Sequence, residues 1–232
     1  MRTSKLSRSL VAAALVSTLS LGAAHAATVR IANQGDALSM DPHSLNESLQ
    51  LSVTGNVYEG LVARDKDLRL VPALATSWKQ TSPTVWRFEL RKGVKFHDGK
   101  PFTADDVVFT AAYAADPATS AVTIGSYKDI KVTKIDSHTV KVEFAKPTPY
   151  WADPLVGNLG MILPKHLFEA YKGAKSREAP NNLKPVGTGP YKFVDFKPGD
   201  MVRGVINNEY HEANRPYFDS IEMKGGGDAV SA

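Results

Sequence analysis

Histidine is the side chain in this sequence best suited to proton transfer near neutral pH or to metal binding. Five histidines follow residue 26, and none has the H-E-x-x-H or H-x-H spacing that presents two imidazoles to one metal. They are His43, His97, His138, His166 and His211. His97 and His211 each precede an acidic residue, and we assign both to structural or surface positions. The sequence therefore predicts no metal site and no cofactor.

Nucleophilic catalysis has little basis in the sequence. The chain has no cysteine and no G-x-S-x-G elbow of the kind found in serine hydrolases. Asp105 and Asp106 form an adjacent carboxylate pair, but they follow Thr103 at the start of a predicted helix. Carboxylates in a first turn interact with the helix dipole, so we expect a structural role and no enzymatic activity.

Two glycine-rich stretches suggest phosphate binding only weakly. Gly187-Thr-Gly189 and Gly225-Gly-Gly227 lack both a following Lys-Ser/Thr and the G-x-G-x-x-G spacing. Tight turns are the preferred interpretation.

The formal charge of +4 gives no argument for nucleic acid, because residues 1–26 hold three basic and no acidic residues. The rest of the chain is therefore close to +1.

Most aromatic side chains are expected in the hydrophobic core, including Trp78, Trp86, Phe96 and Phe102. Trp151 differs because it follows the proline-rich stretch Pro147-Thr-Pro-Tyr. We keep Trp151 as a candidate for an aromatic side chain that lines a ligand cleft.

One segment positions many of these residues. Val85–Arg91 alternates apolar and charged side chains, which predicts a strand with one buried face. His97–Pro101 has the composition of a turn. Thr103 then occupies the N-cap position of a helix whose apolar stripe begins at Val107.

The remaining chain predicts further strands and helices of an α/β domain. Strands are expected at residues 28–32, within 129–144 (two), and at 191–196, 201–207 and 221–224, with helices at 45–61 and from 162. Ser44 and Glu47 fit a capping box for the first of these helices. Residues 68–75 are interpreted as a connector and residues 173–190 as a crossing between subdomains. Pro198-Gly199 is expected at the centre of a hairpin turn.

Residues 1–26 have the pattern of a secretory signal peptide. A basic start precedes an apolar run over residues 10–24, and Ala24-His-Ala26 fits the small-x-small cleavage rule. The run is shorter than the ~20 residues of a membrane span, although an N-terminal anchor helix is the alternative. Cleavage after Ala26 leaves no cysteine for a lipid anchor, so we expect a periplasmic protein without membrane insertion.

The segment from Trp86 to Phe109 resembles the signature of the solute-binding proteins that serve peptide and nickel ABC importers, often called family 5 or cluster C. The residues that carry this resemblance are Trp86, Phe88, Leu90, Gly93, Phe96, His97, Asp98, Gly99, Pro101, Phe102 and Asp106. Further matches follow in order at Leu38–His43, Val57–Leu61, Val186–Tyr191 and Arg215–Asp219. Together they cover nearly all of the chain after residue 26.

The resemblance implies an α/β fold with a mixed sheet and flanking helices, which is lobe I of a two-lobed periplasmic-binding-protein type II fold. It implies a main subdomain of residues 27–59 and 183–232 and a small accessory α+β subdomain of residues 60–182. The crossing between them runs through Gly187, Gly189, Pro190 and Tyr191. Members of this family are more than twice as long, so we expect an N-terminal fragment without the second lobe and without a C-terminal return strand.

The resemblance also implies where a ligand binds. The family pairs the extended backbone of its ligand with protein main chain between the lobes. The matching residues are Asn46, Glu47 and Ser48, although a capping box at Glu47 would place a helix there instead. Asn158, Leu159 and Gly160 are a second candidate contribution, with a plain connector as the alternative.

These observations predict a monomeric solute-binding protein that takes a small molecule, with a peptide as first choice, and delivers it to ABC permease subunits. Nickel complexes, oligosaccharides and opines are alternatives within the family. A secreted hydrolase and a chaperone-like protein with an exposed apolar groove are alternatives outside it. Because most ligand-clamping groups lie in the second lobe, we expect this chain alone to bind weakly or not at all.

Overall fold

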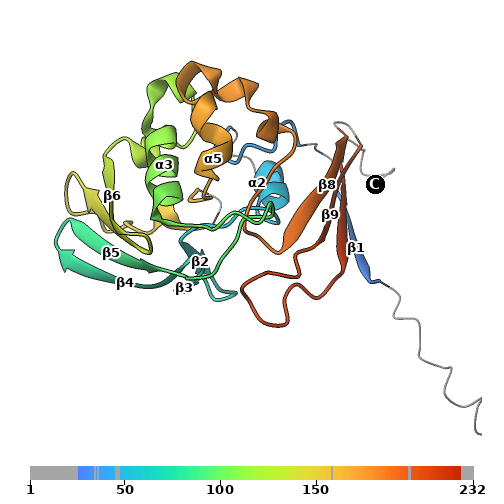
Figure 1. Ribbon diagram of the computed structural model, residues 1–232, viewed down its shortest axis with the longest axis horizontal. Coiled ribbons are helices and arrows are strands. Elements are labelled where there is room, and N and C mark those ends of the chain that lie inside the picture. The colour runs from blue at the N-terminus through green and yellow to red at the C-terminus, as the bar shows by residue number, and fades with distance from the viewer. Residues whose placement is uncertain are drawn as a thin grey trace, which may run out of the picture.

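The computed structural model describes residues 26–33, 35, 37–44, 48–157, 159–197 and 200–225. The described chain forms two four-stranded sheets with helices packed against them (Figure 1). One sheet is mixed and has the order β1-β10-β9-β8, and the other is antiparallel with the order β4-β5-β7-β6. This arrangement confirms the predicted α/β fold with a mixed sheet and flanking helices.

The mixed sheet is buried on one face and charged on the other. Its strands are β1 (Thr28–Ala32), β8 (Tyr191–Lys197), β9 (Met201–Ile206) and β10 (Ser220–Lys224). Side chains alternate between the two faces of a strand, so Ile221 and Met223 are buried while Glu222 faces outward. On that outer face, Nε of Arg30 donates to the Glu222 carboxylate at 2.8 Å and forms an ion pair with it. Helix α2 (Ser48–Thr54) packs on the buried face (Figure 1).

The antiparallel sheet contains the strand that the sequence predicts most clearly. Its strands are β4 (Ala75–Ser82), β5 (Val85–Leu90), β6 (Ile130–Asp136) and β7 (Thr139–Phe144). Phe88 pairs with Val140 across the β5–β7 ladder, and both side chains are fully buried. Arg87 pairs with Lys141 on the other face. The predicted alternation over residues 85–91 is therefore confirmed.

Helix α3 (Ala104–Ala115) begins at the predicted cap. The Thr103 hydroxyl accepts a hydrogen bond from the N–H of Asp105, and Asp106 accepts one from the N–H of Thr103 at 2.9 Å. The second carboxylate oxygen of Asp106 accepts from the N–H of Lys165 at 3.0 Å, which ties α3 to α5 (Lys165–Phe168). Burial raises the pKa of Asp106, and these hydrogen bonds oppose that effect.

Short elements fill the connections. They are β2 (Val62–Arg64), β3 (Leu70–Pro72), α4 (Ile124–Tyr127) and 3₁₀ turns at Pro117–Thr119, Asp153–Leu155, Glu169–Tyr171, Gly173–Glu178 and Pro180–Asn182. The connector expected at residues 68–75 is wrong in part, because β3 pairs with β2 in a two-stranded ribbon. The segment of residues 173–190, expected to be a plain crossing between subdomains, begins with 3₁₀ turns over residues 173–182.

The long helix expected over residues 45–61 is wrong beyond Thr54. Beyond the helix, the backbone bonds to a later segment instead. The Asn56 carbonyl accepts a hydrogen bond from the N–H of Tyr191, and the Val57 carbonyl accepts one from the N–H of Gly189. Of the expected capping box, Glu47 lies outside the described residues, and the Ser44 hydroxyl donates to the Asp41 carbonyl at 2.8 Å. Pro198, Gly199 and the glycines at 226 and 227 also lie outside the described residues.

Among the described residues, buried apolar side chains form two main core clusters. The first surrounds the antiparallel sheet, with Leu61, Phe88, Phe96, Phe102 and Val142 at its centre. The second joins the mixed sheet to the helices and includes Met40, Val53, Tyr113, Phe168 and Ile221. The second cluster draws residues from both sides of the predicted subdomain boundaries. The division into residues 27–59 with 183–232 and residues 60–182 stays a prediction.

Candidate functional site

The loop that leads into the predicted ligand-binding residues is anchored by buried polar side chains. Asp41 accepts a hydrogen bond from the N–H of His43 at 2.8 Å, and the N–H of Asp41 donates to the Ser39 hydroxyl at 3.1 Å. Asp41 is 3% exposed and His43 is fully buried. The D-P-H motif is thus an internal anchor, and it fixes the backbone directly before residue 45.

The ring of His43 connects this loop to two other segments. Its Nε2 lies 3.0 Å from the carbonyl oxygen of Met161, and its Nδ1 lies 3.0 Å from the hydroxyl of Thr123. A carbonyl can only accept, so Nε2 donates and Nδ1 accepts from Thr123. Burial lowers the pKa of His43 more than nearby Asp41 raises it. The ring is neutral and holds one tautomer.

Exposed apolar side chains flank this anchored loop. The N–H of Val122 donates to the His43 carbonyl at 3.0 Å, which lays the segment before α4 beside the loop. Val122 is 46% exposed and Leu38 is 70% exposed. Asn46 and Glu47 lie outside the described residues, and Ser48 is the first residue of α2 as described. Their role in ligand binding stays a prediction.

The nearly buried carboxylate of Glu59 joins the Val57–Leu61 segment to later parts of the chain. Glu59 accepts hydrogen bonds from Nε2 of His211 at 2.8 Å, from the Tyr210 hydroxyl at 3.1 Å and from the Thr188 hydroxyl at 2.8 Å. The side chains of Glu59 and His211 are 10% and 7% exposed. Burial, and then the negative charge of Glu59, raise the pKa of Tyr210, which keeps its hydroxyl protonated as a donor.

Glycines permit the close backbone contacts at this junction. A Cβ on Gly187 would overlap the carbonyl oxygen of Val57, and one on Gly189 would lie 2.7 Å from the same atom. A Cβ on Gly60 would lie 2.8 Å from the backbone nitrogen of Gly157. Residues 56–62 are therefore enclosed by residues 187–191 on one side and by residues 155–160 on another.

The signature turn also contacts the crossing segment. The N–H of Gly187 donates to Nδ1 of His97 at 3.3 Å, and Nε2 of His97 donates to the Gly189 carbonyl at 2.9 Å. Asp98 pairs with His166 at 2.6 Å. Both ring nitrogens of His97 thus contact the crossing segment, and its structural role stays a prediction. The turn links the antiparallel sheet to the start of β8.

A cavity of about 210 Å³ opens beside Glu59. Its walls include Tyr58, Met161, Tyr210 and Glu212. Glu59 already accepts three hydrogen bonds, whereas Glu212 is exposed and has no ion pair among the described residues. The arrangement suits hydrogen-bond donors or a positive group, and it offers no nucleophile.

Of the other predicted ligand-binding residues, Trp151 lies against the antiparallel sheet. Trp151 stacks on Trp86 with ring centroids 3.8 Å apart, and both line an open hollow with Pro147 and Pro149. The Leu159 carbonyl accepts from the Tyr127 hydroxyl at 3.3 Å. Gly160 is packed so closely that a Cβ would lie 2.8 Å from Cα of Leu155. Asn158 lies outside the described residues. Within the described ranges, no hydrogen bond or ring contact joins Trp151 to the Asp41–Ser44 loop.

Sequence reasoning missed Glu59 and its three donors. Glu59 stands between apolar neighbours in Val57-Tyr-Glu-Gly-Leu61, and such an isolated charge indicates a buried partner. That signal could have marked Glu59. It could not have selected His211, because the two residues are 152 positions apart.

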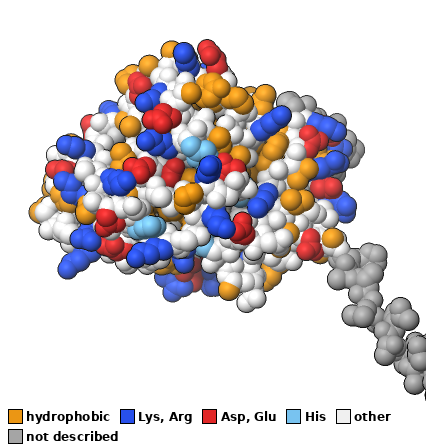
Figure 2. Space-filling view, in the orientation of Figure 1, with side chains coloured by type: hydrophobic (Ala, Val, Ile, Leu, Met, Phe, Trp, Pro, Cys, Tyr) orange, Lys and Arg blue, Asp and Glu red, His pale blue; other side chains and the backbone are white. Residues whose placement is uncertain are grey.

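The described residues contain no cluster of three His, Asp or Glu side chains placed to hold a metal ion. Within the same ranges, no helix has the length and apolar character needed to cross a bilayer. Basic and acidic side chains are interspersed over the face shown in Figure 2.

The mixed sheet, the antiparallel sheet and the crossing between them define one lobe of a type II solute-binding protein. Residues 69–232 match the model of the bacterial extracellular solute-binding proteins, family 5 Middle. This match covers more than half of the chain, so the chain belongs to that family. The family is one of solute binding in transport, not of catalysis.

Three proteins illustrate the relationship. The glutathione-binding protein GsiB of Pectobacterium atrosepticum is 31% identical over 188 residues, which cover 80% of this chain and 35% of GsiB. The periplasmic oligopeptide-binding protein OppA of Escherichia coli K12 is 31% identical over 71% of this chain and 33% of OppA. NikZ of Campylobacter jejuni, solved with Ni(L-His), superimposes with a TM-score of 0.76 at 31% identity. That match covers 85% of this chain and 39% of NikZ.

The chain thus spans about a third of the length of these two curated relatives. The recognition of the family and of a lobe-I fold from sequence is confirmed.

Proposed function

We propose that this protein is the extracytoplasmic solute-binding component of an ABC importer, with short peptides as its ligands. The observation that carries the proposal is the anchored loop at Asp41 and His43, directly before Asn46–Ser48. A backbone anchored up to Ser44 provides a fixed starting point for residues that pair with the extended backbone of a peptide. GsiB and OppA, whose names record binding of glutathione and oligopeptides, support the peptide class.

The proposed mechanism is capture without chemistry. A peptide pairs with residues 46–48, a second lobe closes over it, and the closed monomer docks on permease subunits. Residues 1–26 direct export and are removed after Ala26, which places the protein in the periplasm. The mechanism uses no enzymatic step.

Native mass spectrometry of the protein purified from periplasm tests the ligand class, because a tightly bound solute stays with its protein. A peptide adduct supports the proposal. A nickel isotope pattern would replace peptide with a metal complex as ligand, an alternative that the similarity to the NikZ structure favours. Turnover of peptides or esters without any adduct would overturn a binding function.

Calorimetry with a di- and tripeptide panel tests the backbone pairing. Asn46→Pro removes the N–H that a peptide carbonyl would meet, whereas Asn46→Ala keeps it. We expect affinity to fall about tenfold in the proline variant and to change by less than about threefold in the alanine variant. Equal affinities in the two variants would contradict pairing at this residue. For the 232-residue chain alone we expect dissociation constants weaker than about 1 μM.

A further inference from the structure

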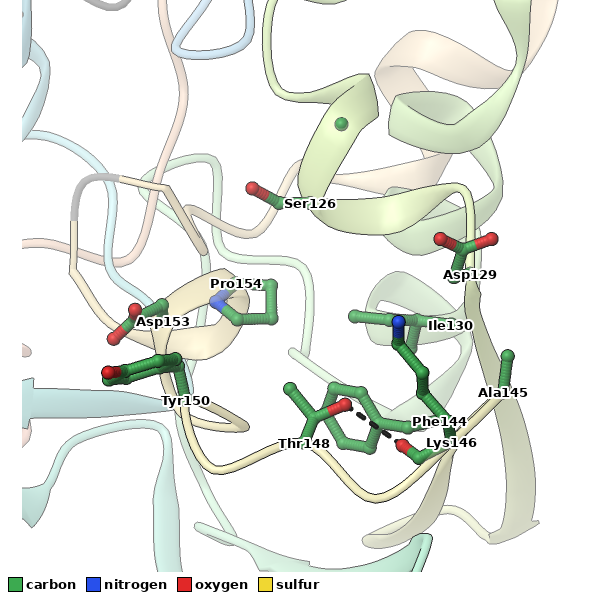
Figure 3. Close-up of a pocket in the computed structure, with 11 residues that line it drawn as sticks. Ser126, Asp129, Ile130, Phe144, Ala145, Lys146, Thr148, Tyr150, Asp153 and Pro154 are labelled. Carbon is green, nitrogen blue, oxygen red and sulfur yellow. Dashed lines mark hydrogen bonds between the residues drawn. The ribbon is translucent and has the colours of Figure 1, made fainter.

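A second pocket lies at the end of the β6–β7 hairpin and shares no lining residue with the cavity beside Glu59. Its volume is about 280 Å³. Helix α4, the start of β6, the end of β7 and the loop of residues 145–154 surround it (Figure 3). None of the predicted ligand-binding residues lines it.

The floor of this pocket is apolar and well supported. Ile130 and Phe144 are register partners in the β6–β7 ladder, and Phe144 is 7% exposed. Pro154 is buried, and its carbonyl accepts from the Tyr127 hydroxyl at 2.7 Å. The N–H of Ala145 donates to the Asp129 carbonyl at 3.1 Å. These contacts hold the walls in place without a ligand.

Two opposite charges stand at one end of the pocket. The side chains of Asp129 and Lys146 are exposed, and among the described residues neither makes a hydrogen bond or an ion pair, with each other or elsewhere. Figure 3 shows the Lys146 amine extended past Phe144, with Asp129 on the same side of the pocket. At the opposite end lie Asp153, which pairs with Arg64 at 3.3 Å, and the ring of Tyr150, which is 76% exposed.

We propose that this pocket binds a free α-amino acid with an apolar side chain. The α-carboxylate pairs with Lys146 and the α-ammonium with Asp129. The side chain lies over Ile130, Phe144 and Pro154 and reaches toward Tyr150. The volume is slightly below the ~300–1,000 Å³ of sites for drug-sized ligands, which suits a single amino acid. Two unpaired charges beside an apolar floor match a zwitterion with an apolar tail.

Titration of the purified 232-residue chain with L-leucine and L-phenylalanine, followed by NMR, tests the site. Saturable binding in the millimolar range is expected, with shifts at Ile130 and Ala145. N-acetyl-L-leucine lacks the ammonium and L-leucinamide lacks the carboxylate, so both should bind at least about fivefold more weakly. Shifts confined to the neighbourhood of His43 and Val122, or no saturation by either amino acid, would overturn the proposal.

Matched variants separate this site from general charge effects. Lys146→Met and Asp129→Asn change exposed, unpaired side chains, so both variants are expected to fold. Each should weaken L-leucine binding by about fivefold. Lys79→Met and Glu178→Gln make the same chemical changes at exposed positions outside the pocket, and their affinities should stay within about twofold of the original. Unchanged affinity in both pocket variants would overturn the assignment, and peptide binding at Asn46 is independent of either result.

Discussion

Nε2 of His211 donates to Oε1 of Glu59 at 2.8 Å, although 152 positions separate the two residues. The same carboxylate also accepts from Thr188 and Tyr210. Three donors from the later part of the chain therefore converge on one acidic side chain in the Val57–Leu61 motif. This convergence fixes how the crossing segment and the loop after β9 meet residues 56–62.

Replacement of Glu59 by alanine should leave three donors, two of them on nearly buried side chains, without their acceptor. We expect a loss of about 3–5 kcal/mol in the free energy of unfolding, because each buried donor left without its acceptor costs about 1–3 kcal/mol. Glu59→Gln keeps one carbonyl oxygen and should lose less, about 1–2 kcal/mol. Urea denaturation measures both. The exposed Glu178→Ala change, at a side chain with no ion pair among the described residues, is the control and should stay within about 0.5 kcal/mol.

The Gly187→Ala variant tests the close approach of the crossing segment to Val57. The added Cβ would overlap the Val57 carbonyl oxygen, so the backbone must move and the bond from Gly189 to Val57 must weaken. We expect a loss of at least about 3 kcal/mol in unfolding free energy. At Gly125 in α4 nothing lies within 4 Å of a new Cβ, so Gly125→Ala should be neutral or stabilising by up to about 1 kcal/mol. Similar stability of the two variants would contradict the packing argument.

The segments that the sequence predicts best are those whose partners are local. β5, the turn at His97 and the capped helix α3 follow from alternation, turn composition and the Thr103–Asp106 box, all within about 30 residues. The hairpins β6–β7 and β8–β9 have the same local origin. The helix expected to reach Leu61 stops at Thr54 because the Asn56 carbonyl accepts from Tyr191 and the Val57 carbonyl accepts from Gly189. No pattern near residue 56 encodes that partner.

The candidate site shows the same limit. His43 and Asp41 belong to a recognisable motif. Their burial and the hydrogen bonds of His43, however, depend on Thr123 and Met161, which lie 80 and 118 positions further along the chain. Motif resemblance located the loop. Only the structure shows that the loop is held from inside by a neutral histidine.

The Trp151→Ala variant tests whether this residue supports the core or a ligand. Trp151 stacks on Trp86 and also contacts Trp78, so all three tryptophans of the chain form one cluster. We expect a loss of about 2–3 kcal/mol in unfolding free energy and a change in tryptophan fluorescence. Tyr150→Ala alters an exposed neighbour and should cost less than about 0.5 kcal/mol. Trp151→Phe should keep most of the stability, and weaker binding of the co-purified solute in that variant would support a ligand role.

The lowered pKa of His97 should make the free energy of unfolding depend on pH. The N–H of Gly187 donates to Nδ1, so this nitrogen carries no proton and the ring is neutral. Burial, assisted by Lys192, lowers the pKa of His97 below its ordinary value of 6.5, against the effects of the Gly189 carbonyl, Glu59 and Asp98. Burial lowers the pKa of His43 in the same direction. Both rings favour the neutral form in the folded state.

A folded-state pKa below the unfolded value means that the unfolded chain takes up the proton first as the pH falls. The stability is therefore complete above pH 6.5 and decreases below it, until the folded-state pKa is reached. Each histidine contributes at most about 1.4 kcal/mol per pH unit. Urea denaturation at several pH values between 7.5 and about 5 should show this decrease, and His97→Gln should reduce its slope by about one proton. An unchanged slope in that variant would contradict the lowered pKa, because it would mean that His97 takes up its proton at the same pH in the folded protein and in the unfolded chain.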